Sequence, residues 1–391
     1  MSEQIANLSY LAVKKESTKG TAVTPTTYLP FFTEALEMDA KLNDIAPIMG
    51  LKAARYDSIK GQREIKGTIA FLGDPNTAGY VLDMLLTQGS ATGGSDPYTH
   101  PFTLSKTTNP KSYTIDILKG QVVFRYFGVE AENVSLDFTN NYLKLTATVS
   151  ALGLLSSRTV ASVGSGTILF TTDSDANATN GFVASDTIRV FLANGSVLDT
   201  TVTSVDNATQ LTVGSNSGVA AGDIVCLRGA TPSFTLTGDY FQFAKTEFRI
   251  SDTAANALTA AHTPVEIGAK LQIMHKFSKP GVEHRSGSYN PTSLVRLAGD
   301  IDLSTKVFFD TPTQEARFFD TSTRAIVMRC FAGSTNQHEL RVTMNKMVIA
   351  GKPVKVDMGN LLYDDIKWTI DYNSSDSQMF DVKVLNAIAT I

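Results

Sequence analysis

Alternation of apolar and polar residues dominates this chain and predicts a mainly β protein. Stretches such as "VSLDFTNNYLKLTATVS" at 134–150 place every second side chain on the same face of a strand. The pattern occurs in both halves of the chain. It predicts strands at 63–72, 112–118, 121–127, 129–138 and 142–150 in the first half, and at 294–309, 324–331, 338–344, 346–358 and 366–373 in the second.

One helix is expected in each half, directly after the first of these strands. Asp74 can cap a helix that begins at Pro75, a position that proline favours. In the second half Thr311 precedes Pro312, and Gln314 completes a capping box. The order of strand, helix and further strands therefore occurs twice. It predicts two tandem β-sandwich or barrel units, each with a short helix.

A change of composition separates the two halves. Residues 160–232 contain no Lys and no Glu, and their two Arg against six Asp account for the whole net charge of −4. Within this stretch "FVASDTIRVF" (182–191) is echoed by "GVAAGDIVCL" (218–227), which favours a small barrel of short strands. We therefore predict a first unit at 1–159, an inserted small β domain at 160–232 and a second unit at 233–391.

Charge and hydrophobicity exclude several classes of protein. A net charge of −4 argues against a basic surface that binds nucleic acids without specificity. No apolar run reaches the length of a membrane span, and the first residues do not resemble a secretory signal, so no membrane insertion is expected. Cys226 and Cys330 lack metal-type spacing and are predicted to be buried thiols, which suits a reducing cytoplasm.

The sequence offers no motif for catalysis or for a cofactor, so we expect no enzyme. Its five histidines show no metal-binding spacing, and nucleotide-binding loops and nucleophile elbows are absent. The nearest approach to a metal motif is "DSDANATNG" at 173–181. There Ala178 and Ala184 stand where a calcium loop of the EF-hand type needs Gly and Glu. An Asx-rich turn is the favoured interpretation, with calcium binding as the alternative.

Two groups of charged residues could serve an assembly. Pairs of acids at strand spacing would each project from one face of a sheet, and they are Glu130 with Glu132 and Asp300 with Asp302. Two turn-rich basic segments at 47–66 and 275–296 read as projecting loops, or as ordinary solvated loops. Their candidate residues are Lys52, Arg55, Lys60, Lys276, Lys279 and Arg285.

Three stretches together resemble the tail tube proteins, or major tail proteins, of long-tailed, siphovirus-type bacteriophages. They are "YLAVKKESTKGTAVTPTTYLPFFTEAL" (10–36), "IKGTIAFLGDPNTAGYVLDMLL" (65–86) and "NVSLDFTNNYLKLTATVSALG" (133–153). The chain from about Gly238 looks like a second copy of the same unit. The resemblance rests on patterns of strand, helix and hairpin and carries over no catalytic residues.

This resemblance implies a structural virion protein, assembled in the cytoplasm of the host bacterium. Its subunits would form rings that stack into a tube for double-stranded DNA, with other tail proteins at the tube ends. Two units per chain predict trimeric rings with pseudo-sixfold symmetry. The acid pairs are then candidates for the channel wall, the basic loops for ring stacking and the inserted domain for the tube exterior. The alternative is a bacterial surface or adhesion-type β protein.

Overall fold

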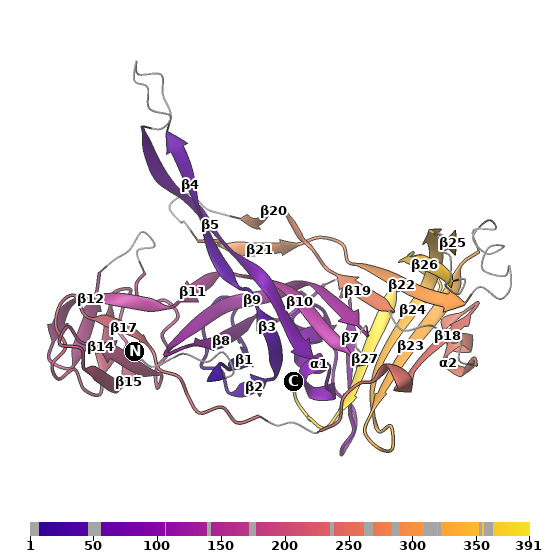
Figure 1. Cartoon of the computed structure of the whole chain (residues 1–391), viewed down its shortest axis with the longest axis horizontal. Coiled ribbons are helices and arrows are strands. Elements are labelled where there is room, and N and C mark those ends of the chain that lie inside the picture. Colours follow the sequence, from indigo (N-terminus) through magenta and orange to yellow (C-terminus); the bar gives the residue numbers. More distant parts are fainter. Residues whose placement is uncertain are drawn as a thin grey trace.

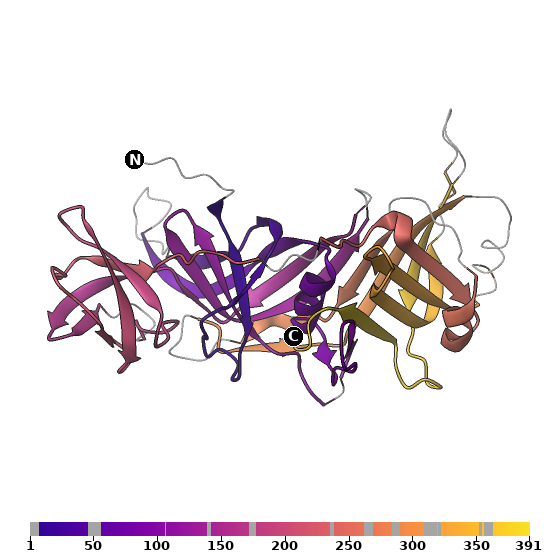
Figure 2. The ribbon, with the colours of Figure 1, turned by 90° about the horizontal axis from the view of Figure 1, so that it is seen from below.

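The computed structural model describes residues 8–45, 56–105, 107–138, 142–171, 177–234, 238–261, 269–283, 290–308, 319, 322–351, 354–355 and 363–391. Antiparallel strands make up nearly all of the regular secondary structure, which confirms the mainly β class (Figure 1). A small barrel, the first unit and the second unit follow one another along the longest axis of the molecule (Figure 2).

The first unit consists of two sheets that share one long strand, β9. The first half of β9 pairs with β8 and β11, and its second half pairs with β10. β1 extends the first sheet next to β8, while β5 extends the second next to β10. The bounds are β1 Leu11–Lys15, β2 Thr27–Leu29, β3 Phe31–Glu34, β4 Glu37–Ile45, β5 Asp57–Leu72, β8 Tyr113–Lys119, β9 Val122–Asp137, β10 Lys144–Ala151 and β11 Gly153–Leu155.

Helix α1 (Pro75–Asp83) follows β5, as the sequence predicts. The Asp74 carboxylate accepts hydrogen bonds from the backbone N–H groups of Asn76 (2.9 Å) and Thr77 (3.2 Å). These bonds satisfy N–H groups that have no partner within the helix. The helix is buried almost throughout and packs against the main core, because Val81 and Leu82 are fully covered.

The residues after β11 form a closed antiparallel barrel. Each of its strands pairs with two others, in the cyclic order β12, β13, β16, β15, β14 and β17 and back to β12. Closure leaves this barrel without a free edge. The bounds are β12 Ser157–Gly164, β13 Thr167–Phe170, β14 Thr187–Phe191, β15 Val197–Val205, β16 Gln210–Val213 and β17 Ile224–Leu227.

The second unit begins with β18 after a short 3-10 turn at Phe243–Lys245. Its bounds are β18 Thr246–Ser251, α2 Ala254–Thr259, β19 Lys270–Met274, β20 Phe277–Glu283, β21 Ser293–Arg296, β22 Asp300–Phe308, β23 Arg324–Ala332, β24 His338–Gly351, β25 Val354–Lys355, β26 Tyr363–Ile370 and β27 Phe380–Asn386. The hairpin of β6 (Thr87–Gln88) and β7 (Tyr98–Thr103) comes from the first half of the chain, yet β7 pairs with β27. The pairing of β7 with β27 therefore ties the two units together.

The strand pairings of the first unit recur in the second. The long strand β24 takes the place of β9, since its first half pairs with β23 and β27 and its second half with β26. Likewise β18, β23, β26 and β22 take the places of β1, β8, β10 and β5. Even the irregularities match: β9 skips one residue between Ala131 and Asn133, and β24 skips one between Ile349 and Gly351. The repeated order seen in the sequence therefore reflects a repeated topology.

Several predicted strand boundaries were wrong. The predicted strands 121–127 and 129–138 are one strand, β9. The predicted strand 338–344 and the first part of the strand predicted at 346–358 are likewise one strand, β24. In contrast, 294–309 is divided into β21 and β22. Alternation cannot distinguish a break from an irregularity through which pairing continues. The helix predicted after Thr311 lies outside the described residues.

Candidate assembly surface

One continuous antiparallel sheet runs through both units. Its strand order is β4, β5, β10, β9, β19, β22, β26 and the end of β24. From the second half of β5 to the end of β24 the face toward the core is apolar, and it includes Ile69, Leu145, Val134, Ile273 and Trp368, all almost fully buried. The strand β4 is exposed along most of its length. Sheet and core are therefore shared by the two units.

The opposite face of this sheet carries polar side chains in rows across the strands. Thr146, Ser135, Gln272, Asp302 and Thr369 lie opposite one another on successive strands. A second row contains Lys144, Asp137, Lys270, Ser304 and Lys367. The sheet thus presents hydroxyl and amide groups together with charges of both signs. These rows could not be predicted from the sequence, because neutral polar residues on a strand carry no signal of their own.

The junction between the units is the pairing of β9 with β19. Asn133 to Asp137 lie opposite Met274 to Lys270, so main-chain hydrogen bonds join the two units directly. The hairpin of β20 and β21 extends this contact onto the first unit. Its Phe277 and Leu294 are buried and pack together with the partly buried Leu152 of the first unit.

An ion-pair cluster holds this hairpin on the first unit. Arg296 of β21 donates to the Glu130 carboxylate from Nε (2.9 Å), and its Nη2 lies 2.8 Å from the same oxygen. Its Nη1 donates to the backbone carbonyls of Ala131 (2.8 Å) and His275 (3.0 Å). Lys19 forms a second ion pair with Glu130. Burial lowers the pKa of Arg296, while the negative charge of Glu130 opposes this shift and favours the charged guanidinium.

The structure therefore corrects the prediction that Glu130 faces a channel. Its side chain is 1% exposed inside a single chain, because the β20–β21 hairpin lies across it. Glu132 forms an ion pair with Lys66 and is 17% exposed. Glu132 is also the residue that β9 skips in its pairing with β10, so period-two alternation does not hold between the two acids.

The second acid pair lies on the polar face of the sheet. Asp300 is exposed and Asp302 is half-buried, one at the start of β22 and the other in the row of polar residues. Burial raises the pKa of Asp302, the neighbouring Asp300 raises it further, and Lys276 lowers it. These two carboxylates remain candidates for a channel wall.

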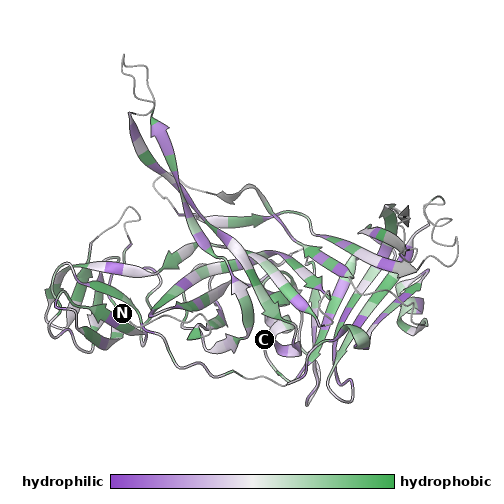
Figure 3. Cartoon of the chain, viewed as in Figure 1, coloured by the Kyte–Doolittle hydropathy of each residue, from purple (hydrophilic) through white to green (hydrophobic). Residues whose placement is uncertain are grey.

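The predicted basic loops correspond to two β-hairpins. The hairpin of β4 and β5 projects away from the body of the molecule, with exposed Lys60 on β5 (Figures 1 and 3). The other is the β20–β21 hairpin, which carries Lys279 on β20, with exposed Lys276 just before it. Lys52, Arg55 and Arg285 lie outside the described residues.

A second buried ion cluster joins the barrel to the first unit. Arg125 of β9 donates to Asp116 of β8 through Nε and Nη2, both at 2.8 Å, and to Asp186 of the barrel through Nη1 (2.5 Å) and Nη2 (3.1 Å). Burial alone would lower the pKa of Arg125, but bonds to Asp116 and the charges of both carboxylates raise it above its ordinary value. The barrel core also includes Tyr10 and Leu155 of the first unit. The barrel is therefore fixed in place.

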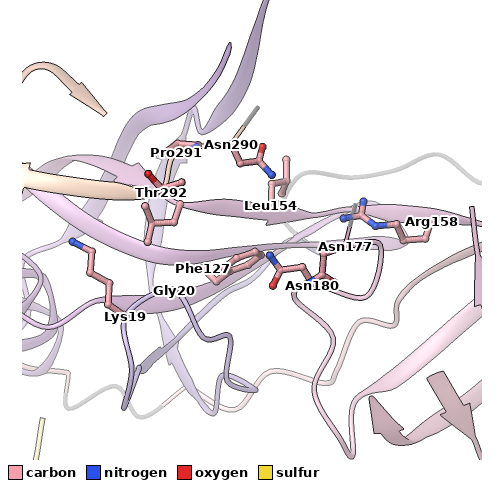
Figure 4. A pocket seen from close by; sticks show the side chains of 11 residues that line it. Lys19, Gly20, Phe127, Leu154, Arg158, Asn177, Asn180, Asn290, Pro291 and Thr292 are labelled. Atoms are coloured by element: carbon pink, nitrogen blue, oxygen red, sulfur yellow. The ribbon is translucent and has the colours of Figure 1, made fainter. Parts of the chain in front are cut away.

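A polar recess lies where the barrel, the first unit and the chain before β21 meet (Figure 4). Its volume is about 280 Å³, and Lys19 and Arg158 line it together with Asn177 and Asn180. Lys19 is already paired with Glu130, and Arg158 donates to the backbone carbonyl of Ala178. The described residues that line the recess include no His, Cys, Asp or Glu.

Other candidate chemistry is sparse in the part of the chain that the structure describes. Cys226 and Cys330 are buried free thiols, as predicted, and burial raises the pKa of Cys226 to about 11. Among the described residues, no group of three His, Cys, Asp or Glu side chains could hold a metal ion. Residues 172–176, which include most of the acidic part of the possible calcium loop, lie outside the described residues.

The described helices are α1, α2 and a short 3-10 turn, and none has the length and apolar character needed to cross a membrane. Neither a protein-family model nor a curated protein matches this chain.

Proposed function

We propose that this chain is a structural virion protein whose stacked rings make the tail tube of a long-tailed bacteriophage. The tube conducts DNA from the capsid to the host cell. The observation that carries the proposal is the doubled topology, with two copies of one unit joined edge to edge through β9 and β19. Repetition of such a junction between chains extends the sheet into a closed wall, which leaves no edge strand free to aggregate.

Three chains with two units each give a ring with six near-equivalent units, so we propose trimeric rings with pseudo-sixfold symmetry. Stacked rings form the tube, and other tail proteins bind at its two ends. The β4–β5 and β20–β21 hairpins, which carry the predicted basic loops, are the candidates for contacts between neighbouring rings.

The polar face of the shared sheet is the proposed channel wall. A wall rich in Lys and Arg would displace the counterions of DNA and hold the duplex. Hydroxyl and amide groups such as those of Thr146, Gln272 and Thr369 bind phosphate weakly, and Lys144 and Lys270 both lie opposite Asp137. Such a surface suits a conduit that must release what passes through it.

Electron microscopy of the purified full-length protein tests the proposal. We expect rings or tubes, and rotational averaging should show six near-equivalent densities around the channel. Native mass spectrometry should count three chains in a single ring. Rings of six chains would contradict the equivalence of the two units, and a protein that stays monomeric at every concentration and salt tested would contradict the proposal itself.

A further inference from the structure

The internal repeat shows where a second copy of the chain should bind. Among the described residues, β4 pairs only with β5. At the other edge, the end of β24 (residues 348–351) and its continuation β25 pair only with β26. Their counterparts, β19 and the end of β9, are each paired on both edges, because they pair with each other. Each chain therefore presents two edges that correspond to the two sides of its own internal junction.

The register of the missing pairing follows from matched pairs in the two units. In the first unit Glu37 lies opposite Lys66, and the corresponding pair in the second unit is Gln272 with Asp302. Leu42 lies opposite Lys60 in the first unit, and the corresponding pair in the second is Phe277 with Arg296. On the other edge, Asn133 lies opposite Thr148 as Gly351 lies opposite Lys367. Asp39 is thus the counterpart of Met274, and Gly351 is the counterpart of Asn133.

We propose that β4 of one chain pairs antiparallel with the end of β24 and with β25 of a second copy, with Asp39 opposite Gly351 and Leu36 opposite Val354. This register is transferred from the internal pairs Met274 with Asn133 and Leu271 with Leu136. The inference rests on the proposed ring assembly and names the surfaces that form its junction between chains.

The exposed fractions of corresponding residues in the two units indicate that the free β4 edge is covered by another unit of the same kind. Phe277 is 7% exposed because the first unit covers it, whereas its counterpart Leu42 is 65% exposed on the free β4–β5 hairpin. The side chain of Arg296 is 3% exposed, whereas its counterpart Lys60 is exposed. A second copy of the chain would cover Leu42 with its second unit, in the way that the first unit covers Phe277.

The two junctions differ in their charged contacts. Val348 stands at the position of Glu130, so the second unit offers no carboxylate there to a hairpin that carries Lys60. The junction between chains therefore depends on main-chain pairing and on apolar contacts around Leu42 and Val348. Leu42 is exposed and Val348 is half-buried in the single chain.

Disulfide trapping tests the register in the full-length protein. The pair Asp39→Cys with Gly351→Cys should form disulfide bonds between chains on mild oxidation, because directly opposite residues bring their Cβ atoms close enough. A Cβ at Gly351 meets only Lys367 atoms, at 4.0 Å, so the substitution fits. The native Cys226 and Cys330 are 0% exposed and should not react. Linked dimers and trimers should appear on a non-reducing gel, and the ladder should end at the trimer.

The matched control is Ala40→Cys with Gly351→Cys. A shift of one residue turns the side chain to the other face of the sheet, so this pair should not link. Rings that form without a bond between positions 39 and 351, or with equal linking in the control, would overturn the register while the proposed function stands. A protein that remains monomeric by light scattering would overturn both. A protein of another kind on this edge would show as a failure of both pairs to link in the purified chain.

Discussion

Replacement of Arg125 by Met should detach the barrel from the first unit. The Arg125 side chain is 2% exposed and forms bidentate contacts with both Asp116 and Asp186, and its Nη1 also donates to the carbonyl of Gly181 at 3.0 Å. Met fills similar volume but supplies no charge and no donor. Two buried carboxylates then face each other without a cation.

The cost follows from the burial of the partners. Removal of one member of a buried ion pair destabilises a protein by about 3–5 kcal/mol, because the remaining charge stays desolvated. Asp186 retains hydrogen bonds from the Thr24 hydroxyl and the Val183 backbone N–H, each at 2.8 Å, which favours the lower end of this range. Since about 1.4 kcal/mol corresponds to a factor of ten, the open population should rise at least roughly a hundredfold.

Trypsin cleavage in the barrel segment, where the sites in 160–232 are Arg189 and Arg228, should become faster than in the unchanged protein as this opening becomes more frequent. Urea unfolding followed by circular dichroism gives the change in stability. Arg189→Met is the matched control, since Arg189 pairs with Asp199 on the barrel surface, where the two side chains are 21% and 29% exposed, and such pairs contribute at most about 1 kcal/mol.

A neutral triple variant separates lost charge from lost shape. Arg125→Met combined with Asp116→Asn and Asp186→Asn should recover much of the stability, because no buried charge remains. The deficit of the single variant should also shrink as the pH is lowered, since burial raises the pKa of Asp116 and its protonated form needs no cation. The reasoning is refuted if Arg125→Met is as stable as Arg189→Met, or if the triple variant is no more stable than the single one.

Three further variants test other parts of the structure. Leu42→Glu should raise the protein concentration needed for rings in a sedimentation assay, because a charge replaces an apolar contact, whereas Val205→Glu on the exposed barrel surface should leave it unchanged. Asp300→Asn should lower the pKa of Asp302 toward the usual Asp value in an NMR titration, because it removes a neighbouring negative charge that raises this pKa; an unchanged pKa would assign the whole shift to burial. Asp74→Ala should cost about 1 kcal/mol in urea unfolding through loss of the α1 cap, and Asp74→Asn, which can still cap, should cost clearly less.

The sequence was sufficient where the determinants of structure are local. Asp74 and Pro75 are adjacent, and together they set the start of α1 with no help from the rest of the chain. Alternation identified most strands, because one side of each sheet is buried and the other is not. The repeated order of elements also appeared in the sequence, although the match between individual residues did not.

The remaining features depend on contacts between distant segments. Glu130 is buried by Arg296, 166 residues further along the chain, and nothing near Glu130 in the sequence indicates this partner. Asp186 meets Arg125 across 61 residues. A single Arg within an otherwise buried strand was the one available signal, because such a charge requires carboxylate partners. The pairing of β7 with β27 has no sequence signature, since tertiary geometry determines which strands pair at a sheet edge.

The barrel belongs to only one of the two units, and this has a consequence for symmetry. It follows β11 and shares its core with the first unit, whereas β27, the counterpart of β11, leads to Ile391, which packs into the main core instead. In a ring of three chains the lining would repeat with nearly sixfold periodicity, while the barrels would repeat with threefold periodicity. A molecule that binds the outer surface of such a ring would meet a barrel at every second unit and no barrel at the units between them. In the proposed ring, one duplicated chain would therefore show a near-uniform lining to DNA and a coarser, threefold pattern to its surroundings.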